Sequence, residues 1–153
     1  MVGIEDKAPD FRLSGSDGKE HTLGEFKDRY LVLYFYPKDN TPGCTMEANE
    51  FNNKIDRIRE LGGEVVGISK DDLKSHEKFI AGHGLKFLLL ADTDSKTIKE
   101  YGAYGDRGIF GTGTLRKTFI INREGKIIKA FDKVDPKGHA KEVIDVLEIL
   151  SQM

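Results

Sequence analysis

The chain has 153 residues, a net charge of −2 and a pI near 6.1, so neither a nucleic acid nor an anionic membrane is an expected partner. We expect residues 1–153 to form one domain, because this length supports a core without disulfides. The single cysteine excludes a disulfide within the chain. No apolar run approaches a membrane span, and residues 1–6 lack the features of a signal peptide. A cytoplasmic location is therefore predicted.

Apolar periodicity and turn residues predict an α/β domain with a central mixed β-sheet flanked by helices and an N-terminal β-hairpin extension. In its first half we expect a hairpin at 10–13 and 21–23, a helical turn at 23–26, a strand at 30–36, a helix from 42 to 62 and a strand at 64–69. In its second half we expect a helix from 71 or 72 to near 82–84, a strand at 87–90, a short helix at 97–101, a hairpin at 115–121 and 126–131, and a last helix opening at 135–136.

The stretch that ends at Cys44 has the features of a reactive-cysteine site. Cys44 falls in the first turn of a predicted helix, after Thr41 as N-cap and Pro42 at the first helical position. Unpaired N–H groups and the positive end of the helix dipole favour the thiolate there. A lone cysteine is otherwise most often a small buried apolar residue. Because the cap, the proline and Gly43 are in register with the sulfur, we favour a reactive thiolate.

Other kinds of cysteine chemistry find little support in the sequence. No second cysteine is available for a Cys-x-x-Cys pair. A cysteine protease needs a histidine base, and a metal site needs ligands at regular spacing. No motif surrounds any of the four histidines, and each is predicted to be a solvated surface residue: His21, His76, His83 and His139. Neither a protease nor a metal site is therefore predicted.

The spacing of Pro37, Thr41 and Cys44 suits a shallow pocket for a small polar molecule. Pro37 would shield one side of this pocket, with Tyr36 just outside it, and the Thr41 hydroxyl could contact a molecule bound over the sulfur. The N–H groups of Gly43 and Cys44 would point into the same space. Such fixed donors could stabilise the negative charge that develops when a thiolate attacks the O–O bond of a peroxide.

Arg116 is the best candidate for a cation that completes this site. It opens the predicted strand at 116–121, and a central position of that strand would bring it beneath the start of the helix. Arginine keeps its charge and can bond both sulfur and substrate oxygens. From the residues alone, an ordinary arginine at a strand end remains an equal alternative.

Segment 35–48, Phe-Tyr-Pro-Lys-Asp-Asn-Thr-Pro-Gly-Cys-Thr-Met-Glu-Ala, resembles the peroxidatic-cysteine segment of the peroxiredoxins, specifically the peroxiredoxin Q or bacterioferritin-comigratory subfamily. Further matches lie at 8–11, 67–69, 75–79, 89–92 and 116–122. The resemblance implies a thioredoxin-like fold and thiol-dependent reduction of hydrogen peroxide and organic hydroperoxides, without a metal or flavin cofactor. It also implies that Arg116 takes part and that Glu47, otherwise read as a solvated helix charge, helps to hold it.

The sequence departs from this subfamily at Asn49, where many members carry a resolving cysteine. The sulfenic acid formed on Cys44 would have no partner in its own chain, which predicts a one-cysteine mechanism. The expected partners are a peroxide and an external thiol: a thioredoxin, a glutaredoxin, a small thiol or Cys44 of another subunit, in a monomer or a homodimer. The alternative is a non-enzymatic redox sensor or chaperone-like binding protein that uses Cys44 oxidation as a switch.

Two other segments are predicted to lie on the surface. Five glycines crowd residues 102–113, and we expect a loop there that acts as a lid or contact surface beside the site. Ile109 and Phe110 of this loop would touch the substrate or a second subunit. The basic cluster at 137–141 is predicted to be a solvated face at a helix start.

Overall fold

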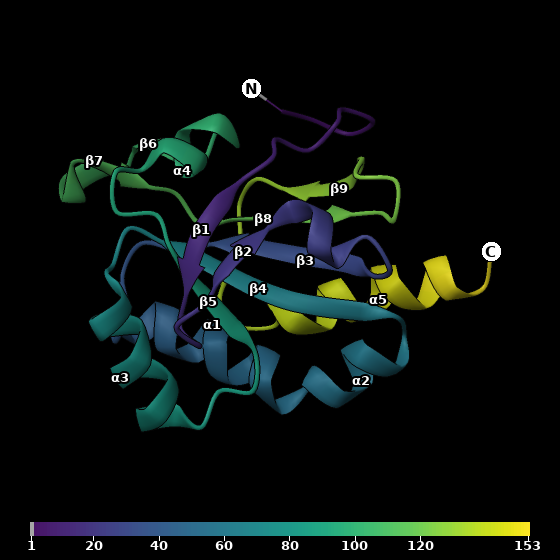
Figure 1. The fold of residues 1–153 in the computed structure, drawn as a ribbon, viewed down its shortest axis with the longest axis horizontal. Coiled ribbons are helices and arrows are strands. Elements are labelled where there is room, and N and C mark those ends of the chain that lie inside the picture. Colours follow the sequence, from purple (N-terminus) through teal and green to yellow (C-terminus); the bar gives the residue numbers. More distant parts are fainter. Residues whose placement is uncertain (1) are drawn as a thin grey trace.

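The computed structural model describes residues 2–153, which form a mixed sheet with helices on both faces (Figure 1). The strands are β1 (Arg12–Gly15), β2 (Glu20–Thr22), β3 (Tyr30–Phe35), β4 (Gly63–Ser69), β5 (Leu88–Ala91), β6 (Tyr104–Asp106), β7 (Thr112–Thr114), β8 (Lys117–Ile121) and β9 (Ile127–Phe131). The helices are η1 (Leu23–Phe26), α1 (Pro42–Asn53), α2 (Ile55–Glu60), α3 (Leu73–His83), α4 (Lys96–Glu100), η2 (Gly108–Phe110) and α5 (His139–Ser151), where η marks 3₁₀ turns.

The main sheet has seven strands in the order β2-β1-β5-β4-β3-β8-β9. β4 pairs in parallel with both β3 and β5, whereas the remaining pairings are antiparallel. The mixed sheet and the N-terminal hairpin, with its turn at Asp17-Gly18, are confirmed. None of the helices in the described range 2–153 is long and apolar enough to cross a membrane.

Strand β3 is buried on both faces and separates two apolar cores. Val32 and Tyr34 point into the core that α1, α2, α3 and α5 cover. Leu31, Leu33 and Phe35 point into the opposite core, which α4 and the N-terminal segment cover (Figure 1). This alternation follows from the side-chain period of two in a strand, and it explains why nearly every residue of β3 is apolar.

The pairing of β3 with β8 positions the site. The two strands are antiparallel, and Phe35 at the end of β3 lies opposite Lys117 at the start of β8. Residue 116 therefore lies at the end of the sheet where β3 stops and the chain runs through residues 36–41 into α1. Two segments far apart in the sequence meet there.

The predicted helix at 42–62 is wrong in one respect, because it is broken at Lys54 into α1 and α2. Just before the break, the Asn52 side chain binds the backbone of the loop between α3 and β5, accepting from Lys86 N at 2.7 Å and donating to Gly84 O at 3.0 Å. The apolar stripe continues through the break and is buried as expected, at Cys44, Ala48, Phe51, Ile55 and Ile58. Periodicity alone could not reveal the break, since both helices keep the same inner face.

Two further predictions of local structure need correction. The last helix begins at His139 rather than at 135–136, because Gly138 adopts a φ of 87° immediately before it. The glycine-rich segment is not an irregular loop: β6 and β7 pair as a small hairpin around η2. Ile109 and Phe110 lie at its tip and are exposed.

Candidate active site

Cys44 lies in the first turn of α1 and is only 1% exposed. Thr41 is the N-cap residue, with an extended backbone at φ −80° and ψ 154°. The expected capping bond to its side chain is absent, and Thr41 Oγ1 donates to Lys38 O at 2.9 Å. The hydroxyl proton is thus engaged, and the oxygen can still accept a hydrogen bond from a molecule over the sulfur.

Arg116 reaches the sulfur from the turn that precedes β8. Its Nη2 lies 3.5 Å from Cys44 Sγ, and its Nη1 donates to Glu47 Oε1 at 2.8 Å. Glu47 is one helical turn after Cys44, so that both side chains lie on the same face of α1. Glu47 is buried rather than solvated, and the Arg116 side chain is only 18% exposed. One guanidinium therefore bridges the thiol and a buried carboxylate.

Gly43 provides the space that this guanidinium needs. A Cβ atom at position 43 would lie 3.1 Å from Arg116 Nη2 and 3.6 Å from Pro136 Cγ. The first distance is tighter than an ordinary van der Waals contact, so a side chain would displace Arg116. Pro136 also shows that the segment before α5 borders the site, which sequence patterns did not indicate.

The ion pair of Glu47 and Arg116 is partly desolvated. Burial raises the pKa of Glu47 to about 7, although the charge and hydrogen bond of Arg116 oppose the rise. Burial by itself would lower the pKa of Arg116, but the charges and hydrogen bonds of Glu47 and Cys44 raise it overall. Among the described residues, Glu47 Oε2 has no hydrogen-bond partner. The carboxylate is therefore poised to titrate near neutral pH, whereas the guanidinium keeps its charge.

Pro37 and Tyr36, which follow β3 and precede α1, are both buried. Tyr36 continues the line of β3, with its backbone N–H bonded to Ile68 O at 3.2 Å. Its hydroxyl donates to Asp39 Oδ1 at 2.6 Å, which ties the strand end to the loop that leads to Thr41. Burial raises the pKa of Tyr36 well above its usual value, so it remains a neutral donor.

The prediction of solvated histidines is wrong for His76 and His139, which are fully buried. His76 contacts Asp39 through Nδ1. His139 Nε2 lies 2.7 Å from Thr118 Oγ1, and its ring packs edge-on against two phenylalanines. Burial lowers the pKa of His139. A signal was available for His76, since it follows Leu73 and precedes Phe79 on the inner stripe of α3.

The other two histidines are also less exposed than predicted. His21 lies between Asp17 and Glu25, and His83 packs edge-on against Phe79. Within residues 2–153, no three His, Cys, Asp or Glu side chains gather in a way that could hold a metal ion. None of the four histidines contacts the sulfur in the hydrogen bonds of the described residues, and Arg116 is the charged group beside it.

Comparisons with known proteins show which family the chain resembles. Residues 4–130 match the AhpC/TSA family. The chain is 40% identical over 154 residues to peroxiredoxin Bcp of Bacillus subtilis, covering 99% of this chain and 98% of that protein. A crystal structure of a cysteine-to-serine mutant of Xylella fastidiosa PrxQ superposes with a TM-score of 0.95, at 33% identity over 99% of this chain and 98% of that chain.

A second solved structure gives the same picture. Bacterioferritin comigratory protein of Xanthomonas campestris, studied for its alkyl peroxide reduction activity, has a TM-score of 0.90 and 33% identity over 98% of both chains. The fold is thus thioredoxin-like, as the resemblance implied. The chain belongs to the AhpC/TSA family as a peroxiredoxin of the Bcp and peroxiredoxin Q type, a thiol-dependent peroxidase.

Proposed function

We propose that Cys44 reduces hydrogen peroxide and organic hydroperoxides by a one-cysteine mechanism, in which a thiol from outside the chain resolves its sulfenic acid. The observation that carries the proposal is the placement of Arg116 Nη2 at 3.5 Å from the sulfur of the only cysteine. Asn49 stands where the subfamily often has a second cysteine, and an amide cannot condense with a sulfenic acid to form a disulfide.

In the first step, the Cys44 thiolate attacks one peroxide oxygen and the O–O bond breaks. The sulfur is oxidised to a sulfenic acid, and the other oxygen leaves with the bonding electrons and takes up a proton to become water or an alcohol. Arg116 would stabilise both the thiolate and the developing oxyanion, together with the N–H groups of Gly43 and Cys44. Thr41 Oγ1 would accept a hydrogen bond from the hydroperoxide O–H, because its own O–H already donates to Lys38 O.

The pocket would favour small substrates. Cys44 is 1% exposed and Pro37 is buried, and a Cβ atom on Gly43 would lie close to both Arg116 Nη2 and Pro136 Cγ. We expect a peroxide to reach the sulfur with its O–O unit while an organic substituent stays outside. Organic hydroperoxides are included because of the alkyl peroxide activity of the Xanthomonas campestris relative.

In the second step, a thiol from outside would condense with the sulfenic acid, and its proton and the sulfenic hydroxyl would leave as water while a mixed disulfide forms. A second thiol would then displace Cys44 and be oxidised in turn. A thioredoxin, a glutaredoxin, a small thiol or Cys44 of another subunit fits this chemistry, and the enzyme would work as a monomer or homodimer. We also propose that residues 1–153 act as one domain in the cytoplasm, where reduced thiols are available.

Peroxide consumption with dithiothreitol as the only reductant tests this proposal. We expect many turnovers per protein chain, and none in Cys44→Ser. Consumption of a single equivalent of peroxide would sink the enzymatic proposal and would favour the redox sensor. An Asn49→Cys variant is the matched control, because it places a second cysteine at the position where many subfamily members carry one.

A further inference from the structure

A buried polar cluster lies directly behind the candidate active site. It joins α3 to the segment 36–41, which we call the pocket loop and which carries Pro37 and Thr41. Asp39, in the middle of this loop, is buried. It accepts hydrogen bonds from Tyr36 Oη at 2.6 Å and from Ser75 Oγ at 2.8 Å. The carboxylate thus holds the loop to the protein interior by its side chain.

Asp39 is the charged centre of the cluster. Burial would raise the pKa of this carboxyl, but the hydrogen bonds and charge of His76, with the hydroxyl bonds, lower it overall. Its backbone N–H donates to Asp71 Oδ2 at 2.8 Å, which places a second carboxylate behind it. An ionised Asp39 can only accept hydrogen bonds, so every group that touches its oxygens must donate.

His76 is the group that meets this demand, and its side chain is 0% exposed. Its Nδ1 lies 2.7 Å from Asp39 Oδ2, and its Nε2 lies 3.0 Å from the backbone oxygen of Leu90. The Leu90 carbonyl has no proton to give, and an ionised Asp39 has none either, so with Asp39 ionised both neighbours are acceptors. A neutral imidazole carries one N–H only and would leave one of these two contacts without a donor. Both contacts are satisfied only when the ring carries two protons.

We propose that His76 is a positioning residue of this peroxidase, a buried imidazolium that holds Asp39 and, through it, the pocket loop against which Cys44 receives peroxide. The expected effect of His76 on peroxide reduction rests on the proposed function, but the protonation of His76 can be measured whether or not the protein is a peroxidase.

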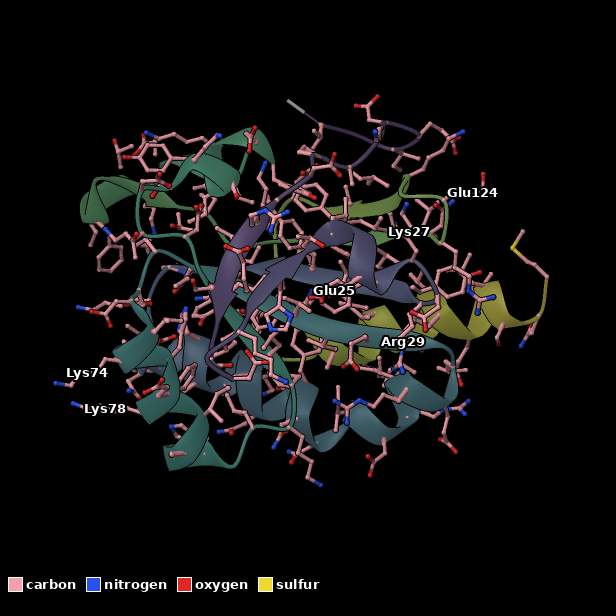
Figure 2. All side chains as sticks on the ribbon, viewed as in Figure 1. Glu25, Lys27, Arg29, Lys74, Lys78 and Glu124 are labelled. Atoms are coloured by element: carbon pink, nitrogen blue, oxygen red, sulfur yellow. The ribbon has the colours of Figure 1, made fainter. Side chains whose placement is uncertain are left out.

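Within residues 2–153, no second cation lies within salt-bridge distance of Asp39. Two lysines flank His76 on the same helix, but Lys74 and Lys78 point away from the body of the molecule into solvent (Figure 2). Among the described residues, His76 is the one basic group within salt-bridge distance of Asp39. The titratable groups that face the pair are Tyr36 from the pocket loop and Asp71 from the segment after β4. Loss of the imidazolium would therefore leave a buried carboxylate without its counter-ion.

Nuclear magnetic resonance of ¹⁵N-histidine-labelled protein tests the protonation directly. We expect both ring nitrogens of His76 to show the shifts of a protonated imidazole at neutral pH. His83, half-buried on the same helix, serves as an internal reference. One protonated and one unprotonated nitrogen on His76 would overturn the inference, whatever the protein's activity.

Kinetics test the positioning role. The pocket geometry guides peroxide, whereas iodoacetamide needs only an accessible thiolate. In His76→Asn we expect the rate constant for peroxide to fall by about 10- to 100-fold, because displacements near 1 Å have effects of this size. Alkylation by iodoacetamide should change less than about threefold if the loop alone has shifted. His83→Asn should leave both rates unchanged.

A double-mutant cycle with Asp39→Asn links the two residues. If His76 acts through Asp39, the double variant should be no slower with peroxide than the slower single variant. Multiplication of the two separate losses would overturn the inference, as would equal losses with peroxide and iodoacetamide. Should His76→Asn fail to fold, His76→Gln offers a second neutral replacement, and the spectrum of the unaltered protein still decides the protonation.

Discussion

Replacement of Arg116 by methionine removes the cation at the sulfur while keeping a side chain of similar length. At 3.5 Å, two unit charges attract by about 5 kcal/mol in an effective dielectric of about 20. Glu47 offsets part of this attraction, and the guanidinium is 18% exposed. We take about half, or roughly 2.5 kcal/mol, as the net stabilisation of the reacting thiolate and oxyanion. A hydrogen bond to a charged group has a similar magnitude of about 1.5–3 kcal/mol.

Since about 1.4 kcal/mol corresponds to a tenfold change in rate, Arg116→Met should slow peroxide reduction by roughly 50- to 100-fold. The assay is single-turnover reduction of hydrogen peroxide by the reduced protein, followed by the appearance of sulfenic acid. The pH profile of iodoacetamide alkylation at Cys44 should also move to higher pH, because the thiolate loses its counter-ion.

The variant must be shown to be folded, because removal of Arg116 leaves Glu47 buried without its partner. Breaking a buried pair costs about 3–5 kcal/mol of stability, and the companion Arg116→Met/Glu47→Gln avoids that cost. The exposed Arg12→Met, distant from the site in the N-terminal hairpin, is the matched control. A folded Arg116→Met with less than about a threefold loss and an unshifted alkylation profile would refute the role of the arginine.

Three further substitutions probe the same site. Burial raises the pKa of Glu47 from 4.5 to about 7, so the folded chain retains a proton that the unfolded chain releases, and stability falls as pH rises from about 4.5 to about 7. Urea unfolding at pH 5 and pH 8 measures the fall in the free energy of unfolding between these two pH values. Glu47→Gln should reduce this fall by up to about 3 kcal/mol, and an unchanged pH dependence would contradict the assignment. Gly43→Ala should displace Arg116 and slow peroxide reduction about 3- to 10-fold, whereas Gly82→Ala, with open space around its Cβ, should not; equal rates would dismiss the close contact. Thr41→Val should slow the same reaction about 100-fold while leaving the fold intact, because the oxygen that accepts a hydrogen bond from the hydroperoxide O–H is removed, and unchanged kinetics would refute that role.

Local patterns predicted most elements of the fold. The apolar run of β3 and the apolar stripe that includes Cys44 and Phe51 are direct consequences of burial. They predict the bounds of this strand and the start of this helix to within a few residues. The break at Lys54 was not predicted because the apolar stripe continues through it, and the contacts of Asn52 just before it are with a loop that is distant in sequence. Such long-range contacts leave no periodic trace.

The meeting of Arg116 and Cys44 could not be deduced from spacing. It depends on β8 lying beside β3 in antiparallel register, and no local pattern states which strands are neighbours. The residues alone made Arg116 the best candidate but left an ordinary strand-end arginine equally possible, and the resemblance to peroxiredoxins then implied its part. The same limit explains the error at His76, whose polar character predicted solvent exposure, although Asp39 and the Leu90 carbonyl lie at its two ring nitrogens. At Thr41 the difference is local, since the hydroxyl donates a hydrogen bond to Lys38 O and no capping bond to its side chain forms.

Intact-mass spectrometry of the peroxide-treated protein tests the central claim most directly. With one equivalent of hydrogen peroxide and no thiol, the account predicts the gain of one oxygen atom at Cys44. Addition of an external thiol should convert this species to a mixed disulfide at the same residue and then, with excess thiol, back to the reduced chain. Failure of Cys44 to gain oxygen, or an oxidised form that no external thiol can reduce, would contradict the one-cysteine peroxidase.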